Sequence, residues 1–535
     1  MLVESGVSGM AVAVCPPAAG RRPSSKRGAE VRVGDHIDLG VLTGELPPLL
    51  IDEVLQETGR CEKRHRRLPA RAVVYFVLAM CLFSGSDSLC PPGYRSVMGN
   101  LLTGLHDLCR GGGYTLATSS ALTQARQRLG AAPLKALFDR VRGPIAPPRS
   151  PWAEAFGLRV VARDGTTLEV ADSPPNAARF GHVGHSKDNP GTDARARAVA
   201  AVERSGRSNG ASLGSNPLVR LMMLVECGTH AVIDAVFDAA SSVSELVLAG
   251  RLVDSLSRGM LLLADRNFAG HELWGRCADT GADLLWRVKK NLVFFVVEPL
   301  PDGSFLSVMP TPTESRRHGM ARFHGRPIDA PPQGHPIRVI EYTVTLTGTD
   351  GAERVEPFRL VTTLLDHRRA PAIELAALYA QCWESETAYS NFKTRIRGAD
   401  TVLRSRGPSG VEQEIYAFLV LFQTLCRIQV AAATRGHIDP DRVSFTITIR
   451  AARMHAARPR ALLTTRQQRQ EHDDFLDELL RDRLPRRRPR QCPRQRRPSR
   501  SRYASKRRDQ PRPSIRAACQ ILIAEPPVMH GYALN

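Results

Sequence analysis

The chain has 535 residues, of which 42% are hydrophobic, enough for a sizeable core in roughly two to four domains. Its 74 Lys and Arg residues outnumber 53 Asp and Glu residues, and the net charge of +21 predicts a polyanionic partner, most often nucleic acid. The longest apolar run, residues 72–83, is too short to cross a bilayer and predicts a buried helix, so we expect no membrane partner.

Cysteine usage points to a reducing compartment. The 11 cysteines include no C-x-x-C pair, which excludes a regular disulfide framework and a paired-thiolate zinc site. We therefore expect a cytosolic protein.

The first third of the chain is expected to be helical. Residues 1–35 carry Gly, Pro, Ser and Arg without periodicity and are expected to be disordered. Residues 36–142 form an all-helical domain, a candidate DNA-end-binding domain, in which apolar periodicity and capping signals mark the helices. These helices are expected at 49–57, 70–82, 94–109, 121–129 and 133–141.

Beyond a proline-rich link the pattern changes to strands that alternate with helices, which predicts a mixed α/β domain. We place its first part at 153–289 and its second part at 366–460, with a β-rich insertion at 290–365 between them. The polar stretch 182–216 is expected to be a flexible excursion from this domain. Residues 461–535 are expected to form a basic, mostly disordered tail.

Two aspartates follow apolar strand patterns. Asp164 comes after LRVVA at 158–162, and the β-like residues 167–170 come next, so its Asp-Gly pair equally predicts a hairpin turn. Asp265 follows MLLLA at the carboxyl end of a buried strand, where open α/β sheets place their ligands. The alternative for Asp265 is a residue that only caps the next turn.

A helix predicted over 375–398 carries a third candidate. Tyr379, Glu386 and Lys393 recur at steps of seven, so at about 100° per residue they share one stripe of that helix. A carboxylate between a phenol and an ammonium suits a metal ligand flanked by phosphate contacts. An ordinary amphipathic helix has the same pattern.

The three carboxylates together predict phosphodiester chemistry. Two hard cations about 3.5–4 Å apart stabilise the attacking and leaving oxygens of such a reaction. Mg²⁺ prefers oxygen ligands. We therefore expect Asp164, Asp265 and Glu386 to be catalytic and to hold two Mg²⁺ ions, which Mn²⁺ can replace.

These motifs carry a family resemblance. DGTT at 164–167, ADRNF at 264–268 and the series Tyr379, Glu386, Lys393 resemble the DDE transposases of bacterial insertion sequences. The resemblance is to the branch named after insertion element four, whose catalytic helix carries Y-x2-R-x3-E-x6-K. It extends over most of the chain, from about residue 36 to about residue 492.

The resemblance implies a fold and an activity. The catalytic domain would be RNase H-like, with Asp164 on its first strand, Asp265 after its fourth and Glu386 on a late helix. A β-rich insertion would interrupt it between the second Asp and the Glu. The reaction would be metal-dependent hydrolysis at the transposon end, followed by attack of the freed 3′-hydroxyl on target DNA.

The same resemblance implies DNA contacts. Tyr379 and Lys393 would bind phosphates of the transposon end. Apart from the resemblance, Arg395 and Arg397 follow Lys393 along the chain, and we expect them to be further phosphate partners. Cys382 occupies the position of the family's Arg, and a thiol cannot make the bidentate phosphate contact of a guanidinium.

The helix at 121–129 is a weaker candidate for DNA contact. Its Gln124, Arg126 and Arg128 suit either a recognition helix for the ends or a solvated helix face.

Three functions remain open from the sequence. The first is a transposase that acts as a homodimer on double-stranded DNA, both transposon ends and target, in the bacterial cytoplasm in association with the nucleoid. The second is a catalytically impaired remnant that only binds DNA, motivated by Cys382. The third is a metal-dependent nuclease without strand transfer.

Overall fold

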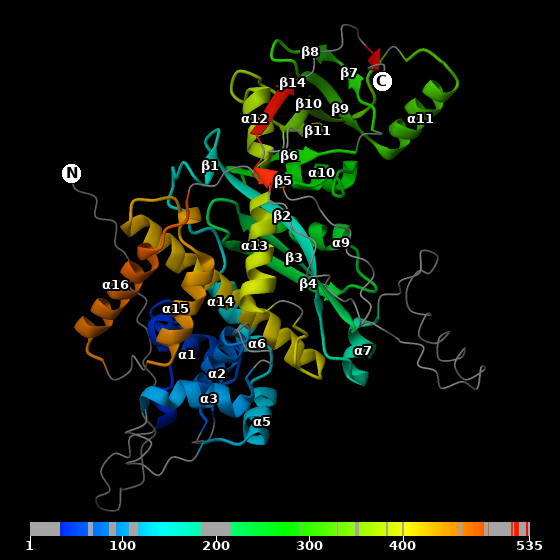
Figure 1. Cartoon of the computed structure of the whole chain (residues 1–535). Coiled ribbons are helices and arrows are strands. Elements are labelled where there is room, and N and C mark those ends of the chain that lie inside the picture. The colour runs from blue at the N-terminus through cyan, green and yellow to red at the C-terminus, as the bar shows by residue number, and fades with distance from the viewer. Residues whose placement is uncertain are drawn as a thin grey trace, which may run out of the picture.

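An eleven-stranded sheet runs through the fold, with helices on both of its faces (Figure 1). The computed structural model describes residues 33–62, 68–84, 92–105, 116–182, 216–289, 292–328, 330–347, 353–380, 383–398, 401–458, 463–485, 490–491, 515–516, 518–523 and 531–532. The strand order is β4-β3-β2-β5-β6-β11-β10-β9-β8, with β1 beside β2 and β14 beside β10. Strand bounds in this sheet are β1 Glu154–Ala155, β2 Leu158–Glu169, β3 Leu218–Glu226, β4 Val232–Ala239, β5 Met260–Ala264, β6 Asp283–Arg287, β8 Glu298–Pro299, β9 Phe305–Pro310, β10 Gly334–Thr347, β11 Glu353–Thr362 and β14 Ala518–Ile523.

The helices pack in two layers against this sheet. Helices α12, α13 and α14 bury side chains in one hydrophobic cluster, and α9 and α10 bury theirs in a second cluster across the sheet. Helix bounds are α1 Pro48–Glu57, α2 Ala70–Leu82, α3 Tyr94–Leu102, α5 Ser119–Leu129, α6 Ala132–Val141, α7 Pro174–Phe180, α9 Glu245–Arg251, α10 His271–Ala278, α11 Pro312–Phe323, α12 Ala372–Ala380, α13 Trp383–Ser390, α14 Pro408–Arg435, α15 Phe445–Ala456 and α16 Thr465–Arg481.

Strand β2 is longer than the sequence predicts. Two separate strands were expected around Asp164, but β2 runs without a break through Asp164 and Gly165. Both residues pair with the antiparallel strand β3, opposite Met223 and Met222. The hairpin interpretation of the Asp-Gly pair is therefore wrong, because the pairing with β3 overrides the local turn preference.

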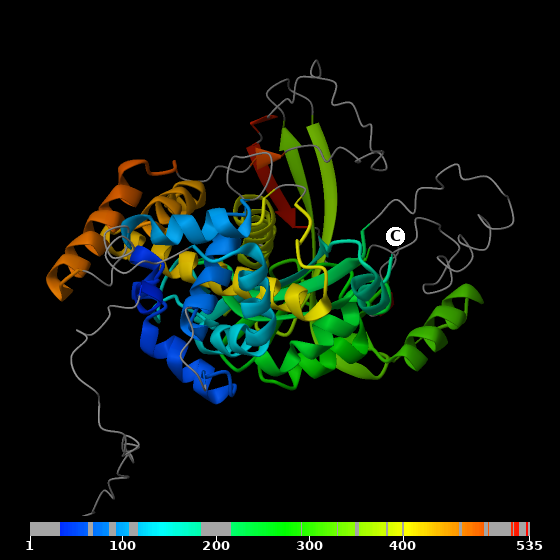
Figure 2. The same ribbon diagram turned by 90° about the horizontal axis from the view of Figure 1, so that it is seen from below.

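The region predicted to be β-rich, 290–365, continues the same sheet. Strand β11 pairs antiparallel with β6, and β10 and β11 form a long hairpin that extends away from the helical body (Figure 2). A short strand, β7 (Phe295–Val296), and the helix α11 also lie in this region. The insertion therefore widens the sheet and does not fold apart from it.

The expectation of a mostly disordered tail is wrong for part of residues 461–535. Helix α16 begins with a capping box between Thr464 and Gln467, and it buries Phe475, Leu476 and Leu479 in the core shared with α14 and α15. Strand β14 pairs antiparallel with β10 (Figure 2). Of the predicted disordered segment 1–35, residues 1–32 lie outside the described residues, and the expectation is wrong for 33–35, which belong to a 3-10 helix, Val33–His36. Nearly all of the predicted excursion at 182–216, residues 183–215, also lies outside the described residues.

Helix α14 is the centre of the helical layer. It packs against α2 and α6 of the N-terminal region and against α15 and α16. Within the described part of the chain it is the one helix long and apolar enough to cross a membrane, and 83% of its most apolar window is buried in the fold. A core helix meets the same test of length and composition.

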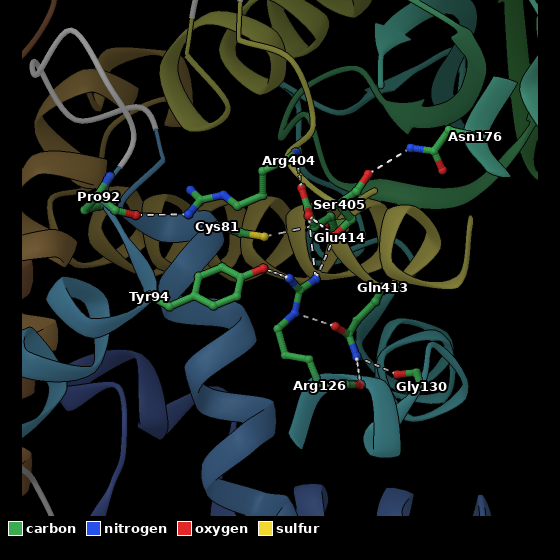
Figure 3. A network of polar contacts seen from close by, with 10 residues as sticks. All are labelled: Cys81, Pro92, Tyr94, Arg126, Gly130, Asn176, Arg404, Ser405, Gln413 and Glu414. Carbon is green, nitrogen blue, oxygen red and sulfur yellow. Dashed lines mark hydrogen bonds and ion pairs between the residues drawn. The ribbon is translucent and has the colours of Figure 1, made fainter. Parts of the chain in front are cut away.

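Arg126 connects the N-terminal helices to the start of α14 in a buried polar network (Figure 3). Its Nε donates to Gln413 at 2.8 Å, its Nη2 donates to the Ser405 hydroxyl at 3.0 Å, and its Nη1 donates to the Tyr94 hydroxyl. The guanidinium also pairs with the Glu414 carboxylate at 3.6 Å. Arg126 is 6% exposed, so the proposed role in reading DNA ends does not fit this conformation.

The same network holds the segment that leads from α13 to α14. The Glu414 carboxylate accepts from the Arg404 amide at 3.1 Å and from the Ser405 hydroxyl, while Asn176 of α7 donates to the Ser405 carbonyl at 2.9 Å (Figure 3). Buried polar networks of this kind fix one arrangement because each member needs its partners.

We expect Arg126→Met to lower the free energy of unfolding by about 3 kcal/mol or more, because it leaves the Glu414 carboxylate buried without its cation. Arg128→Met is the matched control, since Arg128 lies on the same helix and is exposed. Urea unfolding followed by circular dichroism measures both. Equal stability of the two variants would contradict the structural role of the network.

Candidate active site

The two predicted aspartates belong to two strands that are parallel neighbours: Asp164 lies within β2, and Asp265 directly follows β5. Strands β2 and β5 pair in parallel, with Ala162 opposite Leu263 at the end of the ladder. Extended by two residues past the end of this ladder, the register would place Asp164 opposite Asp265, which directly follows β5. Adjacent strands lie about 4.8 Å apart, so carboxylates at these positions are within reach of one shared ion.

The alternation of side chains along β2 and β5 indicates the face of the sheet on which the two aspartates lie. Ala162 and Leu263, two residues earlier on each strand, pack in the cluster that contains α12, α13 and α14. Side chains alternate along a strand, so Asp164 and Asp265 share that face if the alternation continues. Asp164 is half-buried and Asp265 is exposed, which leaves space for water and substrate beside the pair.

Local backbone contacts orient both carboxylates. Asp164 Oδ1 accepts from the Gly165 amide at 2.7 Å, and Asp265 Oδ1 accepts from the Arg266 amide at 2.7 Å. The Asp265 carbonyl accepts from the Phe268 amide at 3.0 Å and closes a turn. Asp265 thus caps its turn, as the alternative to a ligand role expected. It also directly follows the carboxyl end of β5, as the ligand role requires.

Two tyrosines attach the predicted catalytic helix to these strand ends. The Tyr379 hydroxyl, on α12, donates to the carbonyl of Ala264 at 3.2 Å, directly before Asp265. The Tyr389 hydroxyl, on α13, donates to the carbonyl of Asp164 and accepts from the Met223 amide at 2.7 Å. The helical segment is therefore fixed at both aspartates.

Tyr389 is a missed residue of this site. Burial raises its pKa well above the usual value, and the negative charges of Asp164 and Glu245 raise it further. The hydroxyl consequently stays protonated and remains a donor over the neutral range. Its place three residues after Glu386 puts it near the same helix face, but a tyrosine at such a position is also an ordinary core residue.

Glu386 lies in α13 between the two anchoring tyrosines, seven residues after Tyr379 and three before Tyr389. Its side chain is outside the described part of the structure, as is the whole of Cys382. Among the described residues no group of three His, Cys, Asp or Glu side chains is arranged to hold a metal. The convergence of Glu386 with the two aspartates therefore stays a prediction.

A further carboxylate that sequence analysis missed lies close to Gly165. A Cβ at position 165 would approach the Glu245 carboxyl group, at the start of α9, to 3.3 Å. Glycine therefore lets α9 approach the strand beside Asp164. Because side chains alternate along β2, position 165 faces away from Asp164, and Glu245 therefore lies on the α9 face of the sheet. Asp164 and Asp265 themselves supply carboxylate oxygens, the ligand type that Mg²⁺ prefers, so these described residues fit a divalent ion of that class.

The predicted DNA contacts differ in accessibility. Arg395 is exposed and Lys393 is half-buried, whereas Tyr379 and Arg397 are buried. Arg397 Nη1 donates to the Thr401 carbonyl at 2.7 Å, and the Tyr379 hydroxyl is bonded to the sheet. As DNA ligands, Tyr379 and Arg397 would have to exchange these contacts for phosphate.

The predicted single α-helix over 375–398 is wrong at its end. Residues Asn391–Ile396 form a π-helix, whose wider turn moves Lys393 off the straight stripe expected with Tyr379 and Glu386. Ser84 from the end of α2 donates to the carbonyls of Ile396 and Arg397 at 3.2 and 3.1 Å. These long-range contacts satisfy carbonyls that a helix end leaves unpaired.

We expect Tyr389→Phe to lower the free energy of unfolding by about 1–3 kcal/mol, because the buried Met223 amide loses its acceptor. Weaker Mn²⁺ binding should accompany this loss, since α13 is released from the Asp164 carbonyl. The control is Tyr416→Phe, because Tyr416 is a half-buried tyrosine that packs on Phe138 and Phe237. Calorimetry of Mn²⁺ binding that gives the same affinity for wild type and Tyr389→Phe would contradict the anchoring role.

Comparison with known proteins agrees with the motifs. Residues 36–139 match the model described as insertion element 4 transposase N-terminal, and residues 155–422 match the transposase DDE domain. The transposase InsG for insertion sequence element IS4 of Escherichia coli (strain K12) is 25% identical over 431 residues, covering 79% of this chain and 82% of InsG. The putative transposase InsZ of the same organism is 25% identical over 256 residues, covering 47% of this chain and 73% of InsZ.

Among solved structures, the piggyBac transposase synaptic complex with hairpin DNA matches with 10% identity and a TM-score of 0.36, covering 81% of this chain and 84% of that one. The family assignment depends on the sequence models, which together cover the helical region and both halves of the α/β region. The chain belongs to the DDE transposases, in the branch of insertion element 4, the enzymes that cleave DNA and transfer its strands.

Proposed function

We propose that this transposase performs its cleavage and strand transfer at a two-Mg²⁺ site formed by Asp164, Asp265 and Glu386. The observation that carries the proposal is the parallel ladder of β2 and β5, which ends with Ala162 opposite Leu263, two residues before each aspartate. The two tyrosine anchors support it, since they hold the segment that carries Glu386 over the same strand ends.

The strand order supports an RNase H-like core. Strands β2, β3 and β4 are antiparallel neighbours, and β5 and β6 follow on the other side of β2 in parallel. In this assignment Asp164 lies on the first core strand and Asp265 follows the fourth. The β-rich insertion at 290–365 separates 153–289 from 366–460, and 36–142 is proposed to bind DNA ends.

Within this site, the chain's own residues bind and orient the reacting groups. Bound divalent ions would supply Lewis acidity and lower the pKa of an attacking water. Asp164 and Asp265 offer oxygen ligands fixed by backbone contacts, which keeps the ligand geometry set before substrate arrives. Tyr389 holds the Asp164 backbone in place, and the exposed Asp265 leaves access for a phosphodiester.

DNA association is proposed to depend on the basic surface. A net charge of +21 favours contact with phosphates, and the half-buried Lys393 and the exposed Arg395 follow directly after α13. We propose a homodimer on paired transposon ends, acting in the bacterial cytoplasm in association with the nucleoid. The E. coli relatives support the bacterial setting.

The central prediction concerns the three carboxylates. Asp164→Asn, Asp265→Asn and Glu386→Gln should each reduce end cleavage by at least about 1,000-fold, as loss of a charged metal ligand removes several kcal/mol of transition-state stabilisation. DNA binding should change little. Asp279→Asn, an exposed carboxylate after α10, is the control. Normal cleavage by any one of the three variants would remove that residue from the site.

A separate prediction concerns Cys382, which replaces the Arg of the family motif. Cys382→Arg should increase end cleavage, because a guanidinium can bind phosphate in a bidentate manner. Cleavage and joined products are measured together on a labelled end. If neither form cleaves while both bind DNA, the chain acts only as a DNA-binding protein. Nicking without joined products would indicate a nuclease.

A further inference from the structure

A buried guanidinium lies directly beside the predicted catalytic Asp164. Arg163 precedes Asp164 on β2, so its side chain points to the opposite face of the sheet, and it is 3% exposed. Its guanidinium carbon lies 4.6 Å from the ring centroid of Trp286 and 5.0 Å from that of Phe268. Its Nη1 donates to the Cys277 sulfur at 3.4 Å.

The buried charge of this guanidinium has few polar partners. Its Nε and Nη2 atoms have no hydrogen-bond partner in the described part of the chain, and no carboxylate there forms an ion pair with it. Burial is the main cause that lowers its pKa. A buried charge without a counter-ion is costly, and an apolar residue of the same volume is often as stable or more stable.

Another buried arginine of the sheet shows the usual arrangement. Arg338 on β10 is fully buried, and it pairs with Asp302, donates to the Ser304 hydroxyl at 2.7 Å and donates to the Ala370 carbonyl at 2.6 Å. Its burial is explained by these partners. Arg163 lacks such partners, so stability alone does not account for it.

The contacts of Arg163 lead to the second aspartate. Phe268 is 2% exposed, and its amide donates to the Asp265 carbonyl, which closes the turn that carries Asp265. The Arg163 guanidinium contacts two rings, that of Phe268 in the Asp265 turn and that of Trp286 on β6. Arg163 therefore links the strand of Asp164 to the turn of Asp265 from the face opposite the carboxylates.

We propose that Arg163 is a positioning residue of the transposase reaction, which holds the Asp265 turn in register with Asp164 through its cation–π contact with Phe268. The inference depends on the proposed roles of the two aspartates. A stacked guanidinium attracts the ring face electrostatically, and this attraction increases when both groups are removed from water. In this proposal the buried arginine is kept despite its cost in stability, because it fixes the geometry of the site.

The test compares Arg163→Met, Phe268→Leu and the double variant in the full-length protein. Methionine fills a similar volume without charge, so the melting temperature of Arg163→Met should stay level or rise. Its Mn²⁺ dissociation constant without DNA, measured by electron paramagnetic resonance, should increase at least 5-fold, and end cleavage should fall at least 10-fold. The double variant should bind Mn²⁺ no more weakly than the weaker single variant, because both changes remove one contact.

Two outcomes would overturn the inference. Mn²⁺ affinity and cleavage within 2-fold of wild type in Arg163→Met would show that Arg163 does not position the site. A melting temperature low enough to explain the lost cleavage, as we expect for the control Arg338→Met, would show a purely structural role. Asp164→Asn and Asp265→Asn are measured in parallel, and unchanged Mn²⁺ binding in those variants would instead reject the proposed metal site.

Discussion

The parallel pairing of β2 with β5 is the interaction on which the rest of the site depends. Its ladder ends with Ala162 opposite Leu263, two residues before Asp164 and Asp265, which are about a hundred residues apart along the chain. In the proposed site this register aligns the two carboxylates. A slip of one residue would turn one carboxylate to the opposite face. The apolar side chains on both faces of the two strands make that slip costly.

The remaining layers stabilise this register from both sides. On the carboxylate face, Tyr379 and Tyr389 bond directly to the backbone of the two strands. Behind them, α14 joins the N-terminal helices to the catalytic region, and the Arg126 network fixes the connecting segment. The N-terminal region therefore shares a hydrophobic core with the catalytic region.

Local patterns predicted those features that depend on local chemistry. Helix α2 and strand β5 have the predicted bounds, and Asp265 follows β5 as expected. Features that depend on distant partners were missed. The Asp-Gly pair at 164–165 locally predicts a turn, and only its pairing with the distant strand β3 makes it part of a strand. Likewise, the polar helix that carries Arg126 does not indicate locally that this residue pairs with Glu414. The π-helix after α13 is capped by Ser84, more than 300 residues away along the chain. Strand β14 pairs with β10, and Thr347 lies opposite Ala518.

The central claim is that one metal site lies where β2, β5 and α13 meet. Substituting Fe²⁺ for Mg²⁺ and adding ascorbate and peroxide generates hydroxyl radicals at the bound ion, which cut the nearest backbone. The account predicts cuts near Asp164, near Asp265 and within α13, all suppressed by excess Mg²⁺. Cuts confined to other segments, or cuts near the aspartates with α13 spared, would contradict it.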